Sequence, residues 1–383
     1  MMDVNGKFME IGKFIKQKEG YKAFIPNKFP PNKDLKFSQK LIIRHSTAER
    51  LLGKLDGITQ LLPDVDFFLY MFIRKDAASS SQIEGTQATM IDAIEAEAKT
   101  KEALPKDVDD ILHYIKALNY GLKRLADFPL SLRFIRELHK KLMEGARTTQ
   151  LSDPGNFRES QNWIGGTTPT NAIFVPPPPT DMKRALDDFE KFLHAKDDLL
   201  PLVKAGLIHA QFETIHPFLD GNGRTGRLLI TFFLWFRGLL DKPVLFLSSY
   251  FKKHQKVYYD RLYGYPHGKV EKWLEFMLDG VIETADRAVS TAQAITDLRQ
   301  EDMEKIQALS KTASESGVVV LRKLFAWPIV NVNTIKDWTG FTRQGAQRVI
   351  ERFIKLRILE QKDKNENYGR SFMYRRYVDI FTK

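Results

Sequence analysis

The segment HPFLDGNGRTGR, residues 216–227, joins two helical patterns and decides how the chain is interpreted. Apolar residues recur at helical spacing up to His216, and Pro217 then interrupts the helix. The stretch LDGNG, residues 219–223, is typical of a tight turn, and its glycines allow the backbone to approach a ligand closely. A new and very apolar helix begins with RTGRLLITFFLW. The pattern predicts a helix–turn–helix corner with a ligand site at the turn.

The polar residues of this corner suit a nucleotide. Arg224 and Arg227 are three positions apart, so they lie on roughly one helix face and can reach the same phosphate chain. The N–H groups at the start of a helix form a ready anion site. Asp220 is a hard oxygen ligand of the kind that binds Mg²⁺ beside phosphates. His216 can take a proton from an incoming hydroxyl when its imidazole is neutral.

Three other interpretations of the corner stay open. Residues 221–226 match the dinucleotide pattern G-x-G-x-x-G, although that pattern needs a β-strand in front of it and the preceding residues are helix-periodic. His209, Glu213 and His216 have the i, i+4, i+7 spacing of metal ligands on one helix face, but His209 also suits a hydrogen-bonded core position. The plainest interpretation is a corner with surface arginines.

The composition excludes several classes of protein. The 383 residues are 43% hydrophobic and 28% charged, which is ordinary for a globular protein. Because there are no cysteines, disulfides, thiolate nucleophiles and cysteine zinc sites are excluded, and we expect a cytoplasmic protein. The first twenty residues have no apolar signal-peptide core, and the apolar run 228–240 is too short to span a bilayer, so no membrane partner is expected. The net charge of +11 favours polyanionic partners.

Hydrophobic periodicity predicts a mainly α-helical fold. The helical pattern stops at residues 153–179, which are rich in Gly, Pro and Asn and predict loops with a small hairpin turning near Thr168–Asn171. It resumes at about Met182. The segments expected to be helical include residues 38–62, 64–86, 108–126, 131–146 and 202–216.

The last seventy residues have a different pattern. They predict a helix in SGVVVLRKLFAW, a second helix, a turn at residues 339–341 and a helix from about Arg343. Alternation over residues 358–380 around the turn NENYG, residues 365–369, predicts a β-hairpin. Three helices followed by a hairpin outline a winged helix-turn-helix.

The helix that begins near Arg343 is a candidate recognition helix. Residues 331–383 contain twelve Lys/Arg and six Asp/Glu, a difference of six positive charges. DNA binding and protein docking both remain open, because winged helices serve either purpose. The side chains of this helix that suit DNA phosphates and base edges are Arg343, Gln344, Gln347, Arg348, Arg352 and Lys355.

The corner resembles the signature of the Fic family, His-Pro-Phe-x-Asp/Glu-Gly-Asn-Gly-Arg-x-x-Arg, and every specified position matches. PGNFRESQNWIGG and AIFVPPPP resemble the family's segment before the active site, including its flap hairpin, and LSSYFKKHQKVYYDRL resembles the region after it. The resemblance covers about residues 80–280. It implies a Fic-type helical bundle with a small β-hairpin flap, and the expected divisions are an N-terminal helical extension (1–79), a Fic core (80–285), a helical linker (286–320) and a winged helix-turn-helix (321–383).

The resemblance implies transfer of AMP from ATP to a hydroxyl side chain (Ser, Thr or Tyr) of a target protein, with release of pyrophosphate. His216 would deprotonate the hydroxyl, and Asp220 would hold Mg²⁺ on the α- and β-phosphates. Asn222 and the backbone from Gly221 to Gly223 would form the anion hole. Arg224 would bind phosphates and Arg227 the γ-phosphate. Phe218 would be core packing that sets the loop.

The stretch SSSQIEG, residues 79–85, resembles the family's inhibitory motif Ser/Thr-x-x-x-Glu-Gly/Asn. Ser80 and Glu84 are four positions apart and share a helix face. The resemblance implies that Glu84 pairs with Arg227 and occupies the space that the γ-phosphate needs. An alternative is a capping box formed by Ser81 and Glu84 at a helix N-terminus.

Other residues and partners have weaker signals. The flap, residues 164–177, would align a target segment as an added strand. Tyr258 and Tyr259 would face the adenine or pack between helices. Autoadenylylation and a homodimer are further expectations. A nucleotide-sensing, DNA-binding regulator is the alternative function, but the presence of His216 favours an enzyme, because a sensor needs no base.

Overall fold

The corner lies between two helices that are buried on almost every side. The computed structural model describes residues 10–30, 36–61, 65–100, 103–145, 153–363 and 369–382. Helix α7 (Pro201–Ile215) begins with Pro201 in its first turn, and α8 (Asn222–Phe236) packs against it. A helix that is apolar all round is stable only in the centre of a protein. The corner is therefore fixed by the core.

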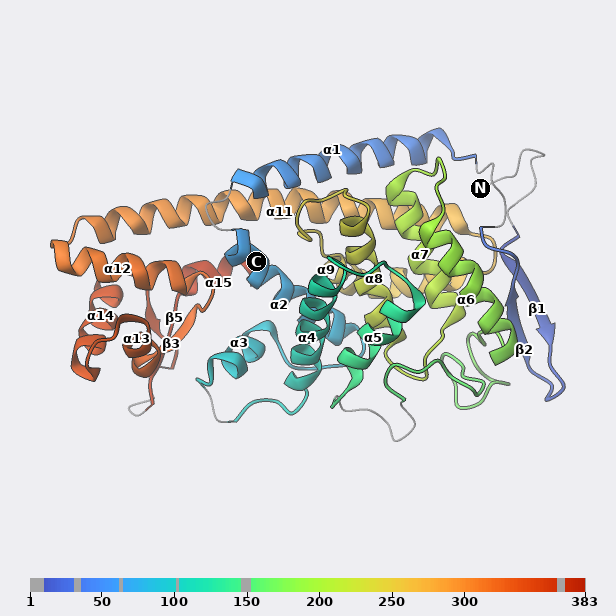
Figure 1. The fold of residues 1–383 in the computed structure, drawn as a ribbon, viewed down its shortest axis with the longest axis horizontal. Helices are drawn as coiled ribbons and strands as arrows, with labels where there is room; N and C mark the ends of the chain where they lie inside the picture. Colours follow the sequence, from blue (N-terminus) through green and yellow to red (C-terminus); the bar gives the residue numbers. More distant parts are fainter. Residues whose placement is uncertain are drawn as a thin grey trace.

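Seven further helices surround this pair and form the predicted helical bundle (Figure 1). Ser131 caps one of them by accepting a hydrogen bond from the backbone N–H of Phe134, and Thr89 forms a capping box at another. The seven are α2 (Val65–Ile83), α3 (Met90–Ala98), α4 (Val108–Arg124), α5 (Leu132–Met143), α6 (Pro179–His194), α9 (Ser248–Lys253) and α10 (Gln255–Gly264).

Two long helices lie along one side of the bundle. Helix α1 (Gln39–Leu61) packs beside α11 (Val270–Gln307), and α11 extends beyond the bundle to the C-terminal elements (Figure 1). Helix α11 is continuous across position 285, where we expected the core to end. Among the described residues, no helix combines the length and the apolar character that crossing a membrane requires.

The N-terminal segment differs from the expectation of a helical extension. Strands β1 (Gly12–Lys16) and β2 (Lys22–Pro26) form an antiparallel hairpin in which Phe14 pairs with Phe24. Gly20 adopts a φ of 93° in the connecting turn, a conformation that favours glycine. The backbone N–H of Phe24 donates to the carbonyl of Val175, 2.9 Å away. The hairpin is therefore attached to the flap.

The flap is held by a single antiparallel bridge and a side-chain-stabilised turn. Ile164 pairs with Phe174. The Oδ1 atom of Asn171 accepts hydrogen bonds from the backbone N–H groups of Thr167 and Thr168, each 2.9 Å long. The predicted turn near Thr168–Asn171 is confirmed.

The C-terminal elements follow most of the predicted order. Gly340, with a φ of 70°, ends α13, and α14 begins at Arg343 as predicted. Strands β3, β5 and β4 form an antiparallel sheet in that order. The elements are α12 (Lys311–Leu324), β3 (Ile329–Asn331), α13 (Val332–Thr339), α14 (Arg343–Lys355), β4 (Glu360–Gln361), β5 (Ser371–Met373) and α15 (Arg375–Thr382).

Helix α15 corrects the prediction that residues 358–380 are a plain hairpin. The strand pattern stops at Met373, and the next residues are helical because Tyr377 and Phe381 bury one helix face. The ring of Phe381 lies 5.2 Å from that of Phe72 on α2. Residues 365–368 of the expected NENYG turn lie outside the described residues.

Candidate active site

The turn of the corner is closed by a side chain. His216 ends α7 with a φ of 49°, and Gly221 begins α8 with a φ of 76°. The Asn222 side chain accepts a hydrogen bond from the N–H of Phe218 (2.9 Å) and donates one to its carbonyl (2.8 Å). Asn222 therefore shapes the loop, while the first N–H groups of α8 have no acceptor within the helix. The dinucleotide interpretation is wrong, because α7 and not a strand precedes the glycines.

His139 on α5 also supports the turn. Its ring stacks on Phe218 with centroids 3.7 Å apart and an interplanar angle of 2°. Its Nε2 donates to the carbonyl of Asp220 and its Nδ1 accepts from the N–H of Gly155, both at 2.9 Å. Burial lowers the pKa of His139 to about 4, so the ring is neutral. A Cβ at Gly221 would lie only 2.6 Å from the Met143 sulfur, so the position requires glycine.

The His216 imidazole has the protonation state of a base. Its Nδ1 lies 3.3 Å from the carbonyl of Glu213, and because a carbonyl can only accept, Nδ1 carries the proton and Nε2 the lone pair. Burial, together with the positive charge of Arg158, lowers the pKa of His216 to about 4. The ring lines a pocket at the corner.

Arg158 is a residue of the site that the sequence did not reveal. Its guanidinium is buried and donates to the carbonyls of His216 (2.9 Å), Ser160 (2.9 Å) and Pro177 (2.6 Å). It therefore fixes the backbone of His216 and the base of the flap together. Burial lowers the pKa of Arg158 to about 10, so it stays charged at neutral pH. Arg158 lies in the segment NFRES, residues 156–160, but no sequence pattern indicated its function.

Asp220 is the carboxylate nearest the turn that reaches solvent. Its side chain is 42% exposed, and Oδ2 lies 3.8 Å from Arg224. Among the described residues, no three His, Cys, Asp or Glu side chains gather into a metal site. A metal at Asp220 would therefore take one protein carboxylate and complete its shell with phosphate oxygens and water. Mg²⁺ binds in this way, so the donor set fits it.

The zinc interpretation of His209 is wrong, because both of its ring nitrogens are engaged. Nδ1 donates to the carbonyl of Gly226 and Nε2 accepts from the hydroxyl of Tyr258, both at 2.9 Å. The ring is fully buried, and burial lowers its pKa to about 3. His209 is a core residue that ties α7 to α8 and α10.

Arg224 and Arg227 are both buried at the start of α8, but they have different partners. The Arg224 guanidinium donates to the Met143 sulfur at 3.3 Å, and its Nε has no hydrogen-bond partner among the described residues. The Arg227 side chain is only 2% exposed. Its Nε donates to the Ser80 hydroxyl (2.9 Å), and its Nη2 donates to the Ser80 carbonyl (2.9 Å) and to Glu84 Oε1 (2.7 Å). Ser80 and Glu84 thus occupy the guanidinium of Arg227.

The position of Glu84 excludes a capping box. Glu84 follows the last residue of α2, and Gly85 leaves the helix with a φ of 96°. A capping box forms at a helix N-terminus, whereas Ser81 and Glu84 lie at the C-terminal end.

The Glu84 carboxylate lies against α8. A Cβ at Gly223 would overlap Glu84 Oε1, so the glycine makes room for the carboxylate. Burial alone would lower the pKa of Arg227, but the negative charge of Glu84 outweighs it and raises the pKa.

These groups open into one pocket of about 560 Å³. His216, Arg227 and Glu84 line it together with Trp163 and the flap residue Ile173. The pocket is large enough for a nucleotide-sized ligand.

Three more side chains of this pocket have distinct surroundings. Tyr258 is buried and its hydroxyl is engaged with His209, whereas Tyr259 is exposed and donates to the carbonyl of Ile83 at 3.3 Å. Glu213 Oε1 is buried without a hydrogen-bond partner among the described residues. Burial raises the pKa of Glu213 to about 8, against the lowering effect of Arg227, so its carboxyl is mostly protonated at neutral pH.

Two family models match the chain over the elements that form this site. The model of the Fic/DOC family N-terminal region matches residues 42–123, which include Ser80 and Glu84, and the model of the Fic/DOC family matches residues 129–234, which include the whole corner. The chain belongs to the Fic/DOC family. Its mainly helical fold with a small antiparallel hairpin is the fold predicted from the sequence.

Similar proteins extend the comparison of this Fic chain. The protein adenylyltransferase Fic of Aedes aegypti is 33% identical over 177 residues, which are 45% of this chain and 32% of that protein. That of Drosophila yakuba is 31% identical over 208 residues, 53% of this chain and 36% of that protein. The chain thus spans about a third of the length of these relatives. A Fic family protein from Desulfovibrio desulfuricans shares the fold, with a TM-score of 0.57 at 18% identity over 89% of this chain and 98% of that chain.

Proposed function

We propose that this Fic chain is a protein adenylyltransferase that transfers AMP from ATP to a hydroxyl side chain of a target protein. The observation that carries the proposal is the neutral imidazole of His216 in the same pocket as Arg227 and the N-terminus of α8. A base and a phosphate site within one cavity suit the activation of an alcohol beside a nucleotide. The relatives with this name support the proposal for the shared region.

In this mechanism, the triphosphate lies over the free N–H groups at the start of α8. Arg224 binds phosphate oxygens, and Arg227 binds the γ-phosphate once its guanidinium is released. Asp220 would hold Mg²⁺, which would supply charge neutralisation at the phosphates. These groups position the α-phosphorus and stabilise the charge that develops on the phosphate oxygens.

The transfer itself needs one base. His216 Nε2 takes the proton of the target hydroxyl while the hydroxyl oxygen attacks the α-phosphorus. The bond from the α-phosphorus to the bridging oxygen of the β-phosphate breaks, and pyrophosphate leaves. The products are an AMP ester of the target side chain and pyrophosphate, with the proton on His216 returned to solvent. Arg158 supports this step by holding the His216 backbone and by keeping the pKa of the imidazole low.

The same proposal includes an intrinsic inhibition. A carboxylate and a γ-phosphate compete for one guanidinium, and Glu84 holds that of Arg227 with a charge-assisted hydrogen bond of 2.7 Å. ADP and AMP lack the competing group, so they bind without displacing Glu84. ATP is bound in a productive pose only when Glu84 moves away from Arg227.

The flap supplies the surface for the target. Ile164 and Phe174 form its only bridge among the described residues. An added strand would pair with the flap backbone groups that have no partner within the protein. Ile173 is exposed beside His216 in the pocket lining. A target segment paired with the flap would present its hydroxyl to the imidazole.

The test compares two labels of ATP. The Glu84→Gly variant is incubated with Mg²⁺, cell lysate and ATP labelled on either the α- or the γ-phosphate. We expect bands labelled from the α-phosphate with Glu84→Gly that are missing with the double variant Glu84→Gly/His216→Ala, whereas labelling from the γ-phosphate by the kinases of the lysate should be the same with both. Labelling from the γ-phosphate that depends on His216, or undiminished α-phosphate labelling without His216, would reject adenylyl transfer.

A further inference from the structure

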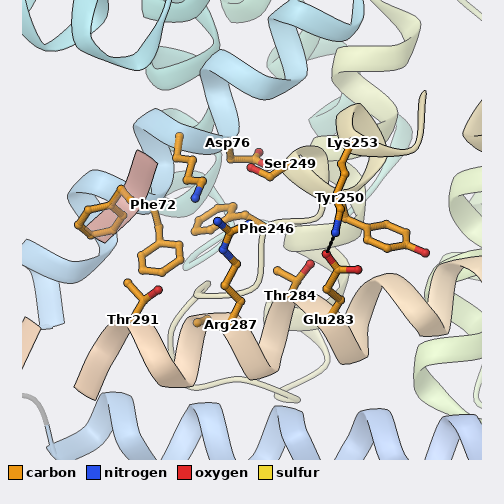
Figure 2. Close-up of a pocket in the computed structure, with 13 residues that line it drawn as sticks. Phe72, Asp76, Phe246, Ser249, Tyr250, Lys253, Glu283, Thr284, Arg287 and Thr291 are labelled. Carbon is orange, nitrogen blue, oxygen red and sulfur yellow. Dashed lines mark hydrogen bonds and ion pairs between the residues drawn. The ribbon is translucent and has the colours of Figure 1, made fainter. Parts of the chain in front are cut away.

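A second, smaller pocket shares no lining residue with the nucleotide site (Figure 2). Helices α2, α9 and α11 supply most of its lining, and Phe246 and Phe381 add apolar surface to it. Its volume of about 50 Å³ is room for a few water molecules or a group of similar size. Arg287 rises from α11 toward Phe246 inside it (Figure 2).

Two cations of this pocket have no counter-charge. Lys75 of α2 and Arg287 of α11 line it together, and neither makes a hydrogen bond or an ion pair with any residue that the structure describes. Lys75 is half-buried and Arg287 is exposed. A half-buried cation is normally paired. Two cations that line one pocket and form no ion pair with its acidic residues therefore indicate an anion site.

The acidic side chains of the pocket are already occupied. Asp76 Oδ1 accepts from the N–H of Ser248 (3.0 Å) and its Oδ2 from the hydroxyl of Tyr114 (2.7 Å). Glu283 forms an ion pair of 2.6 Å with Lys253, as the dashed line in Figure 2 shows. Neither carboxylate pairs with Lys75 or Arg287.

The electrostatics of Lys75 agree with an incomplete site. Its side chain is half-buried. Burial, together with the positive charge of Arg287, lowers its pKa to about 8. At neutral pH the lysine is nevertheless mostly protonated, so two like charges face each other in a partly apolar pocket. An anion between them would offset both the repulsion and the loss of hydration.

We propose that this pocket binds a phosphate-type oxyanion between Lys75 and Arg287. A tetrahedral dianion matches both the two positive charges and the small volume, whereas a whole nucleotide needs the larger pocket at His216. The hydroxyl of Thr284 lines the same space and supplies a neutral donor, and the hydroxyl of Ser249, which also lines it, shares a hydrogen bond of 3.0 Å with Ser79. Lys75 precedes Ser80 by five positions on the same helix, so a bound oxyanion links the helix that holds Arg227 to α11.

The test is a calorimetric titration of the full chain with inorganic phosphate at constant ionic strength, with chloride as the reference anion. We expect saturable binding that weakens at least tenfold in Lys75→Met and in Arg287→Met. Lys252→Met removes a nearby α9 cation outside the pocket and should leave the affinity within twofold. Arg224→Ala removes a phosphate contact of the nucleotide site, and the binding event that Lys75→Met weakens should persist in this variant, which separates the two sites. Sulfate, a dianion of the same shape, should compete.

Unchanged phosphate affinity in both pocket variants, or no saturable binding to the wild type, would overturn the proposal. A thermal melt covers the possibility that a variant is misfolded. In phosphate-free buffer Lys75→Met should melt no lower than the wild type, because it removes an uncompensated cation. Phosphate should then raise the melting temperature of the wild type and not that of Lys75→Met. A variant that melts lower without phosphate would contradict the proposal, since Lys75 would already have a favourable partner.

Discussion

Replacing Glu84 by glycine removes the carboxylate that holds Arg227, and the structure sets the size of the effect. The contact is a charge-assisted hydrogen bond of 2.7 Å to a guanidinium that is 2% exposed. Such a bond contributes about 1.5–3 kcal/mol. Because Glu84 itself is 38% exposed, solvent screening places its contribution at or slightly below the lower end of that range, about 1.4–2 kcal/mol. We expect kcat/KM for ATP to rise by about 10–30-fold in Glu84→Gly.

The assay is the initial rate of AMP incorporation at several ATP concentrations, together with the affinity for ADP. The affinity for ADP should change less than about twofold, because ADP has no γ-phosphate and does not compete with Glu84. Glu84→Gln is the matched control, since it keeps the size and one hydrogen bond but removes the charge, and its rate should lie between those of the wild type and Glu84→Gly. Equal rates in all three proteins would refute competition for Arg227. An equal gain in ADP affinity would place the effect of Glu84 elsewhere.

Four further outcomes follow from the site. Ser80→Ala leaves Arg227 with Glu84 but removes one of its hydrogen bonds, so the rate of AMP incorporation should rise only a few-fold. In Glu84→Gly, the pH profile of kcat/KM should lose activity as pH falls toward about 4, not near 6.5, because His216 stays neutral above its lowered pKa of about 4. Burial and the charge of Glu84 raise the pKa of Glu213 to about 8 in the wild type, so in Glu84→Gly KM for ATP should increase as the pH rises toward 8 and the Glu213 carboxyl ionises, and the added change Glu213→Gln should abolish the increase. His209 has a pKa of about 3 in the folded state, so the unfolded chain binds its proton first, and the free energy of unfolding measured with urea should fall as pH decreases from about 6.5 toward 3.

Local signals in the sequence were sufficient to predict the ends of the helices at the corner, the turn before α14 and the helix face that carries Ser80 and Glu84. Pro217 and the glycines set the ends of α7 and α8, Gly340 and Arg343 set the turn before α14, and the sequence spacing of Ser80 and Glu84 placed both on one helix face. The contact between Glu84 and Arg227 is present, although only the family resemblance had indicated it. The helix ends and the turn depend on residues close in sequence, and the contact between Glu84 and Arg227 depends only on the packing of the C-terminal end of α2 beside α8.

The features that the sequence did not reveal depend on distant contacts. Arg158 acts through three carbonyls, one of which lies 58 positions away, and carbonyls leave no trace in a sequence pattern. The sequence indicated Glu213 only as a possible zinc ligand. Its raised pKa results from burial beside Gly226, and this burial depends on the packing of α7 against α8. Residues 375–382 alternate like a strand but fold as α15 because the bundle offers Phe381 an apolar contact on α2. The N-terminal hairpin likewise depends on its bond to Val175 of the flap.

The central claim concerns what the corner holds. The most direct measurement is a pair of crystal structures, of the wild type and of Glu84→Gly, each grown with Mg²⁺ and a non-hydrolysable ATP analogue. We expect the triphosphate of the variant to lie over the N-terminus of α8, with Arg227 on the γ-phosphate and the α-phosphorus within reach of His216 Nε2. In the wild type, Arg227 should remain on Glu84. An adenine nucleotide bound elsewhere, with the corner unchanged in both crystals, would contradict the account.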